Sequence, residues 1–213
     1  MKRNEKVGVV FDMDGTLMNS VPLLYSGMCA VFRHCSLESP PLVEYLCECA
    51  PPWMPFYERR GVRLSRKELF AIYNRASDTS EAEAFPDVEP TLDELCREGI
   101  PIGAVSSQRE MVVAAYRARI PQLKNGAFVV GGVDDKAPAI REFCRKYCLP
   151  PSRVFVVGDF TSDMWDARRA RGRGVGIIRG NGTRDALLAA GAYFCIETLE
   201  SLPPMLGCIE LPQ

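Results

Sequence analysis

The sequence predicts an α/β protein whose core is a doubly wound parallel sheet, with a small α-helical domain inserted into it. Three observations support this fold class. Short β-branched runs recur along the second half of the chain, helical patterns separate them, and about 90 residues without a convincing strand follow the first run. Sheets of this kind bind their ligands at the carboxyl ends of the strands.

Each expected strand is a short apolar run, as in a strand that is buried on both faces. These runs cover residues 7–11, 102–105, 128–130, 154–157, 175–178 and 193–196. Helical patterns lie between or after the later runs, over residues 91–98, 110–119, 137–147, 162–171 and 185–190. Most of these patterns stop at a glycine or just before a proline, residues that end helices.

The interval after the first strand is expected to be helical throughout. Apolar residues lie near helical spacing over residues 21–32, 42–49 and 65–76, prolines separate these segments, and the polar stretch 77–83 reads as a return linker. We therefore expect an α/β core formed by residues 1–17 and 85–213, and an inserted helical domain formed by residues 18–84.

Composition excludes several classes of protein. The 213 residues carry 26 Lys and Arg against 27 Asp and Glu, a net charge of −1, and 47% of them are hydrophobic. This balance is typical of a globular protein, and it argues against a nucleic-acid binder. No run approaches the roughly 18 apolar residues of a membrane span, and aspartates precede any signal-like segment. A soluble cytoplasmic protein without a membrane partner is expected.

Nine cysteines are present, an odd number without regular spacing, so reduced and mostly buried thiols are expected. Cys144 and Cys148 are four residues apart on an expected helix and could share a metal, but no CxxC partner follows them. His34 is the one histidine, which makes histidine-based nucleophilic catalysis a poor hypothesis. Acid–base chemistry would then fall to carboxylates.

Two carboxylates follow the first strand directly, in the sequence Phe11-Asp12-Met13-Asp14-Gly15-Thr16. Residues two apart in an extended chain point to the same side, so Asp12 and Asp14 can face one site. Two carboxylates this close repel each other, which favours a cation between them or a raised pKa on one. Mg²⁺ suits such oxygen ligands. The alternative is a turn that uses two aspartates.

A second acidic pair, Asp159 and Asp163, follows the expected strand 154–157. If this strand neighbours the first one, Asp159 arrives opposite Asp12. Asp163 lies in the first turn of the next helix, where it could equally complement the helix dipole.

Two further strand ends carry polar groups. Ser106 and Ser107 follow the second expected strand and open the next helix, an arrangement that suits an anion. Lys136 lies at a helix start after the third strand, where it could neutralise an anion. Taken singly, Ser106 could be a helix cap and Lys136 a surface charge. Together with the acids they form a set at four strand ends, which favours one site.

These motifs resemble those of the haloacid dehalogenase-like superfamily of phosphohydrolases. Asp12-Met13-Asp14-Gly15-Thr16 is similar to the family's first motif, Ser106 to its second, Lys136 to its third, and Gly158-Asp159 with Asp163 to its fourth. The inserted helices resemble the cap of the phosphoglycolate phosphatase-like branch. Phe160 departs from the pattern, because a small polar residue is usual there.

The resemblance implies a mechanism through carboxylates. Asp12 would be the nucleophile that forms an aspartyl-phosphate, and Asp14 would be the general acid and base. Ser106 and the Ser107 amide would bind phosphoryl oxygens, and Lys136 would offset negative charge on the nucleophile and the phosphate.

The resemblance also implies a Mg²⁺ cofactor. The Asp12 carboxylate, the Asp14 backbone carbonyl and Asp159 would hold the ion, and Asp163 would support the metal site.

The expected function is thus a Mg²⁺-dependent phosphatase that acts on a small phosphomonoester, as a monomer or homodimer. A sugar phosphomutase and a non-enzymatic binding protein are the alternatives. Side chains that could contact the leaving group are Trp53, Phe56, Tyr57, Arg59, Arg60, Arg63 and Arg109. Those of the cap could equally be its core and its solvent-facing charge.

Overall fold

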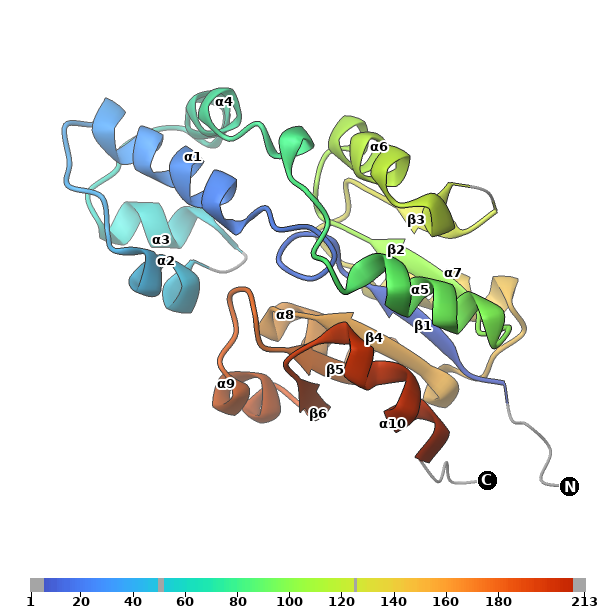
Figure 1. Ribbon diagram of the computed structural model, residues 1–213. Coiled ribbons are helices and arrows are strands. Elements are labelled where there is room, and N and C mark those ends of the chain that lie inside the picture. The colour runs from blue at the N-terminus through green and yellow to red at the C-terminus, as the bar shows by residue number, and fades with distance from the viewer. Residues whose placement is uncertain (1–5, 50–51, 125, 209–213) are drawn as a thin grey trace, which may run out of the picture.

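The core of the protein is a six-stranded, fully parallel sheet with strand order β3-β2-β1-β4-β5-β6 (Figure 1). A computed structural model describes residues 6–49, 52–124 and 126–208. The strands are β1 (Gly8–Phe11), β2 (Ile102–Val105), β3 (Phe128–Val130), β4 (Val154–Gly158), β5 (Arg173–Ile177) and β6 (Ala192–Ile196). The predicted fold class is confirmed. The strand order reverses at β1, because β2 and β3 lie on one side of it and β4, β5 and β6 lie on the other.

Both faces of the sheet are buried, and the strand residues divide between two hydrophobic clusters with a period of two. Val9 and Phe11 of β1 belong to one cluster, and Val10 between them belongs to the other. In β4, Val154 and Val156 belong to the same cluster as Val10. This burial on both faces explains why the strands read as continuous apolar runs rather than as alternating ones.

The helices of the core cover the two faces in separate groups. One cluster includes residues of α5 (Val88–Arg97), α6 (Glu110–Arg119) and α10 (Leu202–Cys208), and the other includes residues of α7 (Ala137–Lys146) and α8 (Thr161–Arg169). The short helix α9 (Arg184–Ala189) contacts β5, β6 and α8. Four single-turn 3₁₀ helices cover Thr79–Glu81, Pro121–Leu123, Pro151–Arg153 and Leu199–Ser201.

Four helices follow β1 and form a separate lobe beyond the carboxyl ends of the strands (Figure 1). They are α1 (Val21–His34), α2 (Leu42–Glu48), α3 (Met54–Arg59) and α4 (Arg66–Ala76). Ser65 begins α4 with a capping box, since its hydroxyl accepts from the Glu68 amide and the Glu68 carboxylate accepts from the Ser65 amide. The lobe has a hydrophobic cluster of its own. A bridge between Met18 and Ala84 brings the two connecting segments together.

The structure departs from the predicted elements at several places. Helices α3 and α10 were not predicted, because each is short and carries prolines that suggest loops. Cys148 lies two residues beyond the end of α7 in the left-handed region, with φ of 53°. The prediction of mostly buried thiols is wrong, because Cys47, Cys96 and Cys148 are exposed, whereas Cys49 and Cys144 are buried.

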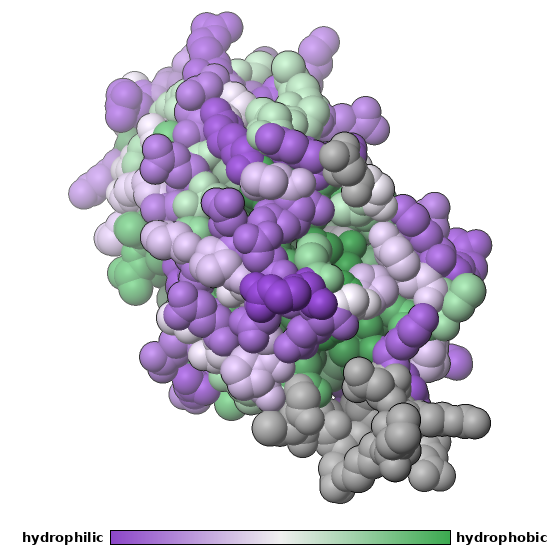
Figure 2. All heavy atoms as spheres, turned by 45° about the vertical axis from the view of Figure 1, so that its right-hand side comes forward, coloured by the Kyte–Doolittle hydropathy of each residue, from purple (hydrophilic) through white to green (hydrophobic). Residues whose placement is uncertain are grey.

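The outer surface shown in Figure 2 is mostly hydrophilic, with hydrophobic side chains exposed over a limited area. The large hydrophobic side chains that are exposed are spread over several elements, and they are Leu42, Val43, Met111, Trp165, Leu188 and Tyr193. Single exposed apolar residues are normal in folded proteins. Within the described residues, no helix has the length and apolar character that a membrane crossing needs.

Candidate active site

The predicted polar groups follow the carboxyl ends of four adjacent strands, so they lie along one edge of the sheet. The strands β3, β2, β1 and β4 are neighbours in that order, and all run in the same direction. Asp12 follows β1, Ser106 follows β2 and Asp159 follows β4, and Lys136 lies before α7 in the loop that follows β3. The condition under which Asp159 arrives opposite Asp12 is met, because β4 pairs with β1.

Lys136 connects the carboxylates of the two acidic motifs. Its ammonium nitrogen lies 2.5 Å from Asp12 Oδ1 and 2.7 Å from Asp163 Oδ1, and the three side chains are buried. Burial disfavours the charged ammonium, but the two carboxylates outweigh this effect and raise the pKa of Lys136 above its usual value. The side chain therefore stays positively charged, and it offsets part of the negative charge at the site.

One lysine does not neutralise the three buried carboxylates of Asp12, Asp159 and Asp163. An oxygen from each lies within 4.8 Å of the others. Burial and the neighbouring acids raise the pKa of Asp12 well above its ordinary value, although Lys136 opposes the shift. Burial and Asp163 raise the pKa of Asp159 to about 7. Hard oxygen donors with uncompensated negative charge fit a divalent cation such as Mg²⁺.

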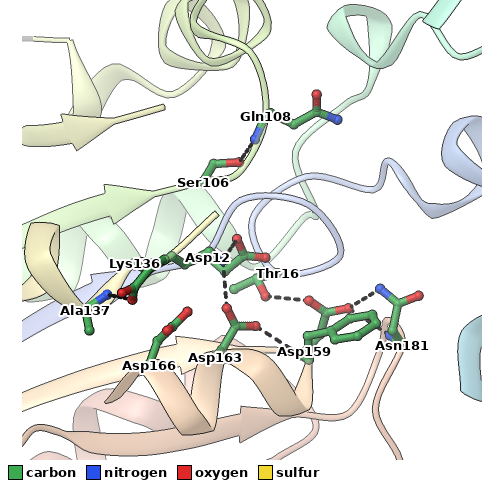
Figure 3. Close-up of polar contacts among 12 residues, drawn as sticks. Asp12, Thr16, Ser106, Gln108, Lys136, Ala137, Asp159, Asp163, Asp166 and Asn181 are labelled. Carbon is green, nitrogen blue, oxygen red and sulfur yellow. Dashed lines mark hydrogen bonds and ion pairs between the residues drawn. The ribbon is translucent and has the colours of Figure 1, made fainter. Parts of the chain in front are cut away.

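Asp159 is fixed by hydrogen bonds from two loops (Figure 3). The Thr16 hydroxyl donates to Oδ1 at 3.2 Å, and the backbone and side-chain amides of Asn181 donate to Oδ2 at 2.7 and 2.9 Å. Gly15, with φ of +73°, and Gly180 approach the same carboxylate so closely that a Cβ at either position would collide with it. The first motif and the loop after β5 thus enclose Asp159.

Asp14 faces a different partner from Asp12. Its Oδ1 accepts a hydrogen bond of 2.8 Å from the hydroxyl of Tyr116, a buried residue of α6. Its carboxylate is outside the group formed by the other three acids. Burial raises the pKa of Asp14, while the hydrogen bond from Tyr116 opposes that shift. A carboxyl with a raised pKa can both give and take a proton.

The serine pair lies in a loop and does not open a helix, because α6 begins only at Glu110. The buried Ser106 hydroxyl accepts from the Gln108 amide at 3.0 Å, which shapes the loop after β2. Ser107 and Arg109 line the neighbouring cavity. The expected helix N-terminus is therefore replaced by a loop with exposed backbone.

A cavity of about 210 Å³ lies between the core and the helical lobe, over the acidic cluster. The predicted catalytic, phosphate-binding and metal-binding residues that line it are Asp12, Asp14, Ser107, Lys136, Asp159 and Asp163. Of the side chains suggested as contacts for the leaving group, Trp53, Tyr57 and Arg109 line it. Ser106 is in the loop beside it. Three residues near the site were not predicted from the sequence, namely Tyr116, Asn181 and the buried Asp166. Burial raises the pKa of Asp166 to about 6. Asn181 could have been found, because it stands between two glycines at the end of a fifth strand.

Comparison with known proteins agrees with this geometry. The family model of the haloacid dehalogenase-like hydrolases matches residues 9–177, most of the chain. The chain belongs to this family. It is therefore a hydrolase, and the resemblance that the four motifs indicated is confirmed.

Curated relatives and solved structures cover nearly the whole chain. The phosphoglycolate phosphatases of Yersinia pseudotuberculosis and Escherichia coli (strain K12) are each 25% identical to it; the first match covers 96% of this chain and 94% of the relative, the second 94% and 92%. A haloacid dehalogenase-like hydrolase structure from Streptococcus pneumoniae has a TM-score of 0.80 at 20% identity, covering 94% of this chain and 98% of that one. One from Deinococcus radiodurans, with bound phosphate and sodium, scores 0.75 at 15% identity and covers 95% of each chain. This hydrolase thus has the family's fold, and its curated relatives are phosphatases.

Proposed function

We propose that this hydrolase is a Mg²⁺-dependent phosphatase that cleaves a small phosphomonoester through an aspartyl-phosphate on Asp12. The observation that carries the proposal is the buried contact of Asp12 with Lys136, beside the acid cluster where β1 and β4 meet. Phosphoryl transfer requires positioning and charge stabilisation, which this set of groups can supply without a histidine. The substrate is a free small molecule of the cytoplasm in this proposal.

Asp12 is the proposed nucleophile because one of its oxygens is free to react. Its hydrogen bond to Lys136 uses Oδ1, so Oδ2 can attack phosphorus. The new bond joins Oδ2 to phosphorus as the bond between phosphorus and the ester oxygen breaks. The positive charge of Lys136 and the backbone amide of Ser107 offset the charge that develops on the phosphoryl oxygens.

Asp14 is the proposed proton carrier. In the first step it gives its proton to the departing ester oxygen, so that the alcohol leaves neutral. In the second step it takes a proton from the water that attacks phosphorus, and the bond between phosphorus and Asp12 breaks. Burial, which raises the pKa of Asp14, supports its protonated state before the first step.

Asp12, Asp159 and Asp163 are the carboxylates that would hold Mg²⁺, together with the backbone carbonyl of Asp14. When bound, the ion supplies positive charge beside the phosphoryl group and offsets the repulsion between nucleophile and substrate. The hydrogen bonds from Thr16 and Asn181 would keep Asp159 oriented toward it.

The direct test is release of inorganic phosphate from a panel of small phosphomonoesters, measured with Mg²⁺ and with a chelator. We expect release that needs Mg²⁺. A phosphomutase would interconvert two sugar phosphates with little free phosphate, and a binding protein would release none. Either of these results would contradict the proposal.

The substitution Asp12→Asn tests whether Asp12 is needed for catalysis rather than for folding. The amide cannot act as the nucleophile, so we expect kcat to fall by about 10³-fold or more, with a thermal midpoint close to that of the native protein. Asp93→Asn, which alters a surface carboxylate that accepts from Gln122, is the matched control and should keep full activity. Near-native activity of Asp12→Asn would exclude the aspartyl-phosphate route.

A further inference from the structure

The cavity over the acid cluster has two walls of opposite character. Every charged side chain that lines it comes from the core, and these are Asp12, Asp14, Arg109, Asp134, Lys136, Asp159, Asp163 and Asp166. Among the described residues, the helical lobe contributes only neutral ones, which are Leu24, Tyr45, Cys49, Trp53, Tyr57, Phe70, Tyr73 and Asn74. We call this neutral wall the aromatic chamber, because five of the eight side chains are aromatic.

Two lobe arginines that the sequence suggested as contacts for an anion are engaged elsewhere. Arg60 binds the carboxylates of Glu44 and, at 2.7 Å, Glu48, and it lies over the Phe56 ring with 4.1 Å to its centroid. Arg63 donates to the backbone oxygen of Glu58 at 2.8 Å. Neither arginine lines the cavity, and Arg59 does not line it either. The exposed Arg66 lies over the Phe70 ring, 5.5 Å from its centroid, and pairs with Asp134 at 3.7 Å. The chamber itself therefore lacks the positive charge that the sequence suggested for it.

The chamber keeps its neutral character around neutral pH. Burial raises the pKa of the Cys49 thiol to about 12, and it also raises the pKa of the Tyr57 hydroxyl. Both side chains are almost fully buried. A carboxylate that entered the chamber would lose its hydration and find no cation in return, which is strongly unfavourable. An apolar ring would lose little hydration energy, and it would gain contact with the aromatic side chains.

A contact between Trp53 of the lobe and Phe160 of the core connects the two walls of the cavity. Their rings meet edge to face, with centroids 6.2 Å apart and planes at 70°. Phe160 follows Asp159 directly, so an aromatic surface begins beside the acid cluster and continues into the lobe. A flat ring attached to the ester oxygen would meet this surface on leaving the phosphoryl site. Arg109 also lines the cavity, but it comes from the core, in the loop of Ser107.

We propose that the aromatic chamber selects phosphomonoesters whose alcohol carries an uncharged aromatic ring, and disfavours those whose alcohol carries a carboxylate, as phosphoglycolate does. This inference rests on the phosphatase function proposed above and defines its substrate class. The curated relatives are named for phosphoglycolate, so the proposal separates this chain from them in specificity.

Benzyl phosphate, ethyl phosphate and phosphoglycolate test this directly, because each releases a primary alcohol and the esters differ mainly in the group that would occupy the chamber. The measurement is kcat/KM for phosphate release with Mg²⁺. We expect benzyl phosphate to exceed both others by roughly tenfold or more, in line with burial of one aromatic ring. Phosphoglycolate should be the poorest of the three.

Variants of the chamber make the test specific. Trp53→Leu and Phe70→Leu should each lower kcat/KM for benzyl phosphate roughly fivefold, a larger loss than either causes for ethyl phosphate. Asn74→Arg places a cation in the chamber and should raise kcat/KM for phosphoglycolate. Tyr193→Leu is the control, because Tyr193 is an exposed aromatic residue of β6 that does not line the cavity.

The outcomes separate this inference from the function on which it rests. A preference for phosphoglycolate over benzyl phosphate, or chamber variants that affect all three esters equally, would overturn the inference and leave the phosphatase function intact. No phosphate release from these esters or from an activated aryl phosphate would overturn both. A thermal midpoint for each variant identifies any that fail to fold, and the intact protein's ranking of the three esters decides in that case.

Discussion

Tyr116 shows how a side chain far away in sequence completes a motif. Its hydroxyl holds Asp14 Oδ1 at 2.8 Å from a buried position on α6. If Asp14 carries the proton, Tyr116 acts by positioning it. The hydrogen bond then matters most when the alcohol needs protonation in order to leave.

Tyr116→Phe removes this hydrogen bond and keeps the ring. We expect kcat to fall about tenfold with an alkyl phosphate, little change in KM, and a much smaller loss with 4-nitrophenyl phosphate, whose alcohol leaves without a proton. The control is Tyr147→Phe, a tyrosine near the surface of the core. Equal losses with both esters would indicate a purely structural role for Tyr116.

The buried carboxylates also predict how Mg²⁺ affects stability at different pH. Without metal, the folded-state pKa of Asp159 is about 7, whereas an unfolded aspartate has a pKa of about 3.9. The folded state therefore binds a proton between these values, so the free energy of unfolding decreases as pH rises through this range. Mg²⁺ competes with that proton and should stabilise the protein more at high pH.

Differential scanning fluorimetry measures this effect. At an Mg²⁺ concentration of about 100 Kd the gain is about 2.7 kcal/mol, or roughly 5–10 °C for a chain of this size. We expect this gain at about pH 8 and a clearly smaller gain at about pH 5. Asp159→Asn should lose most of it. An equal gain at both pH values would contradict the assignment of Asp159 to the metal.

Asp12, Asp14 and Lys136 were predictable because an apolar strand shows where its carboxyl end lies. Tyr116 was not, because an aromatic residue on an amphipathic helix reads as core and its hydroxyl partner depends on tertiary packing. Asn181 depends in the same way on how the loop after β5 folds over Asp159. Polar residues at the ends of strands are thus visible in a sequence before the groups that orient them.

Among the secondary-structure elements, an ion pair connects the loop after β5 to the start of α5. Arg179 binds both oxygens of Asp87 at 2.6 Å, donates to the backbone oxygen of Thr16 and lies over the Phe85 ring with 4.0 Å to its centroid. Both charged side chains are 12% exposed. The Leu199 amide also donates to Asp87. This network fixes both chain segments that lead into the helical lobe.

Asp87→Ala should therefore be costly, because it leaves the Arg179 guanidinium buried without its partner. We expect a loss of about 3 kcal/mol in the free energy of unfolding, measured by urea denaturation. Glu197→Ala, which removes the partner of the exposed Arg184, should leave stability almost unchanged. Similar effects of the two variants would contradict a structural role for the buried pair.

Short elements were the hardest to predict. Helix α4 was predicted to within one residue of its start from the apolar spacing over residues 65–76, and β2 and β3 were predicted to the residue. Helices α3 and α10 were missed, because prolines in or next to the first turn are tolerated in a helix although they suggest a loop.

For the molecule as a whole, our proposal is that the insertion decides what the candidate active site can accept. The core supplies the charged groups, and the lobe that follows β1 closes the cavity with neutral side chains. The interval of about 90 residues and its helical patterns predicted this lobe. The cavity could not be predicted, because it depends on which faces of α1 to α4 turn toward the sheet. The boundaries of the cap domain, at residues 18–84, stay a prediction.

The central claim is that phosphate passes through a covalent bond to Asp12, and trapping that bond tests it most directly. Asp14→Asn should slow the second step, so acid-quenched samples of this variant, taken after mixing with 4-nitrophenyl phosphate and Mg²⁺, can be digested and examined by mass spectrometry. We predict a phosphoryl group on the peptide that contains Asp12, and its absence when Asp12→Asn is added. A phosphoryl group on another residue, or none during measurable turnover, would contradict the account.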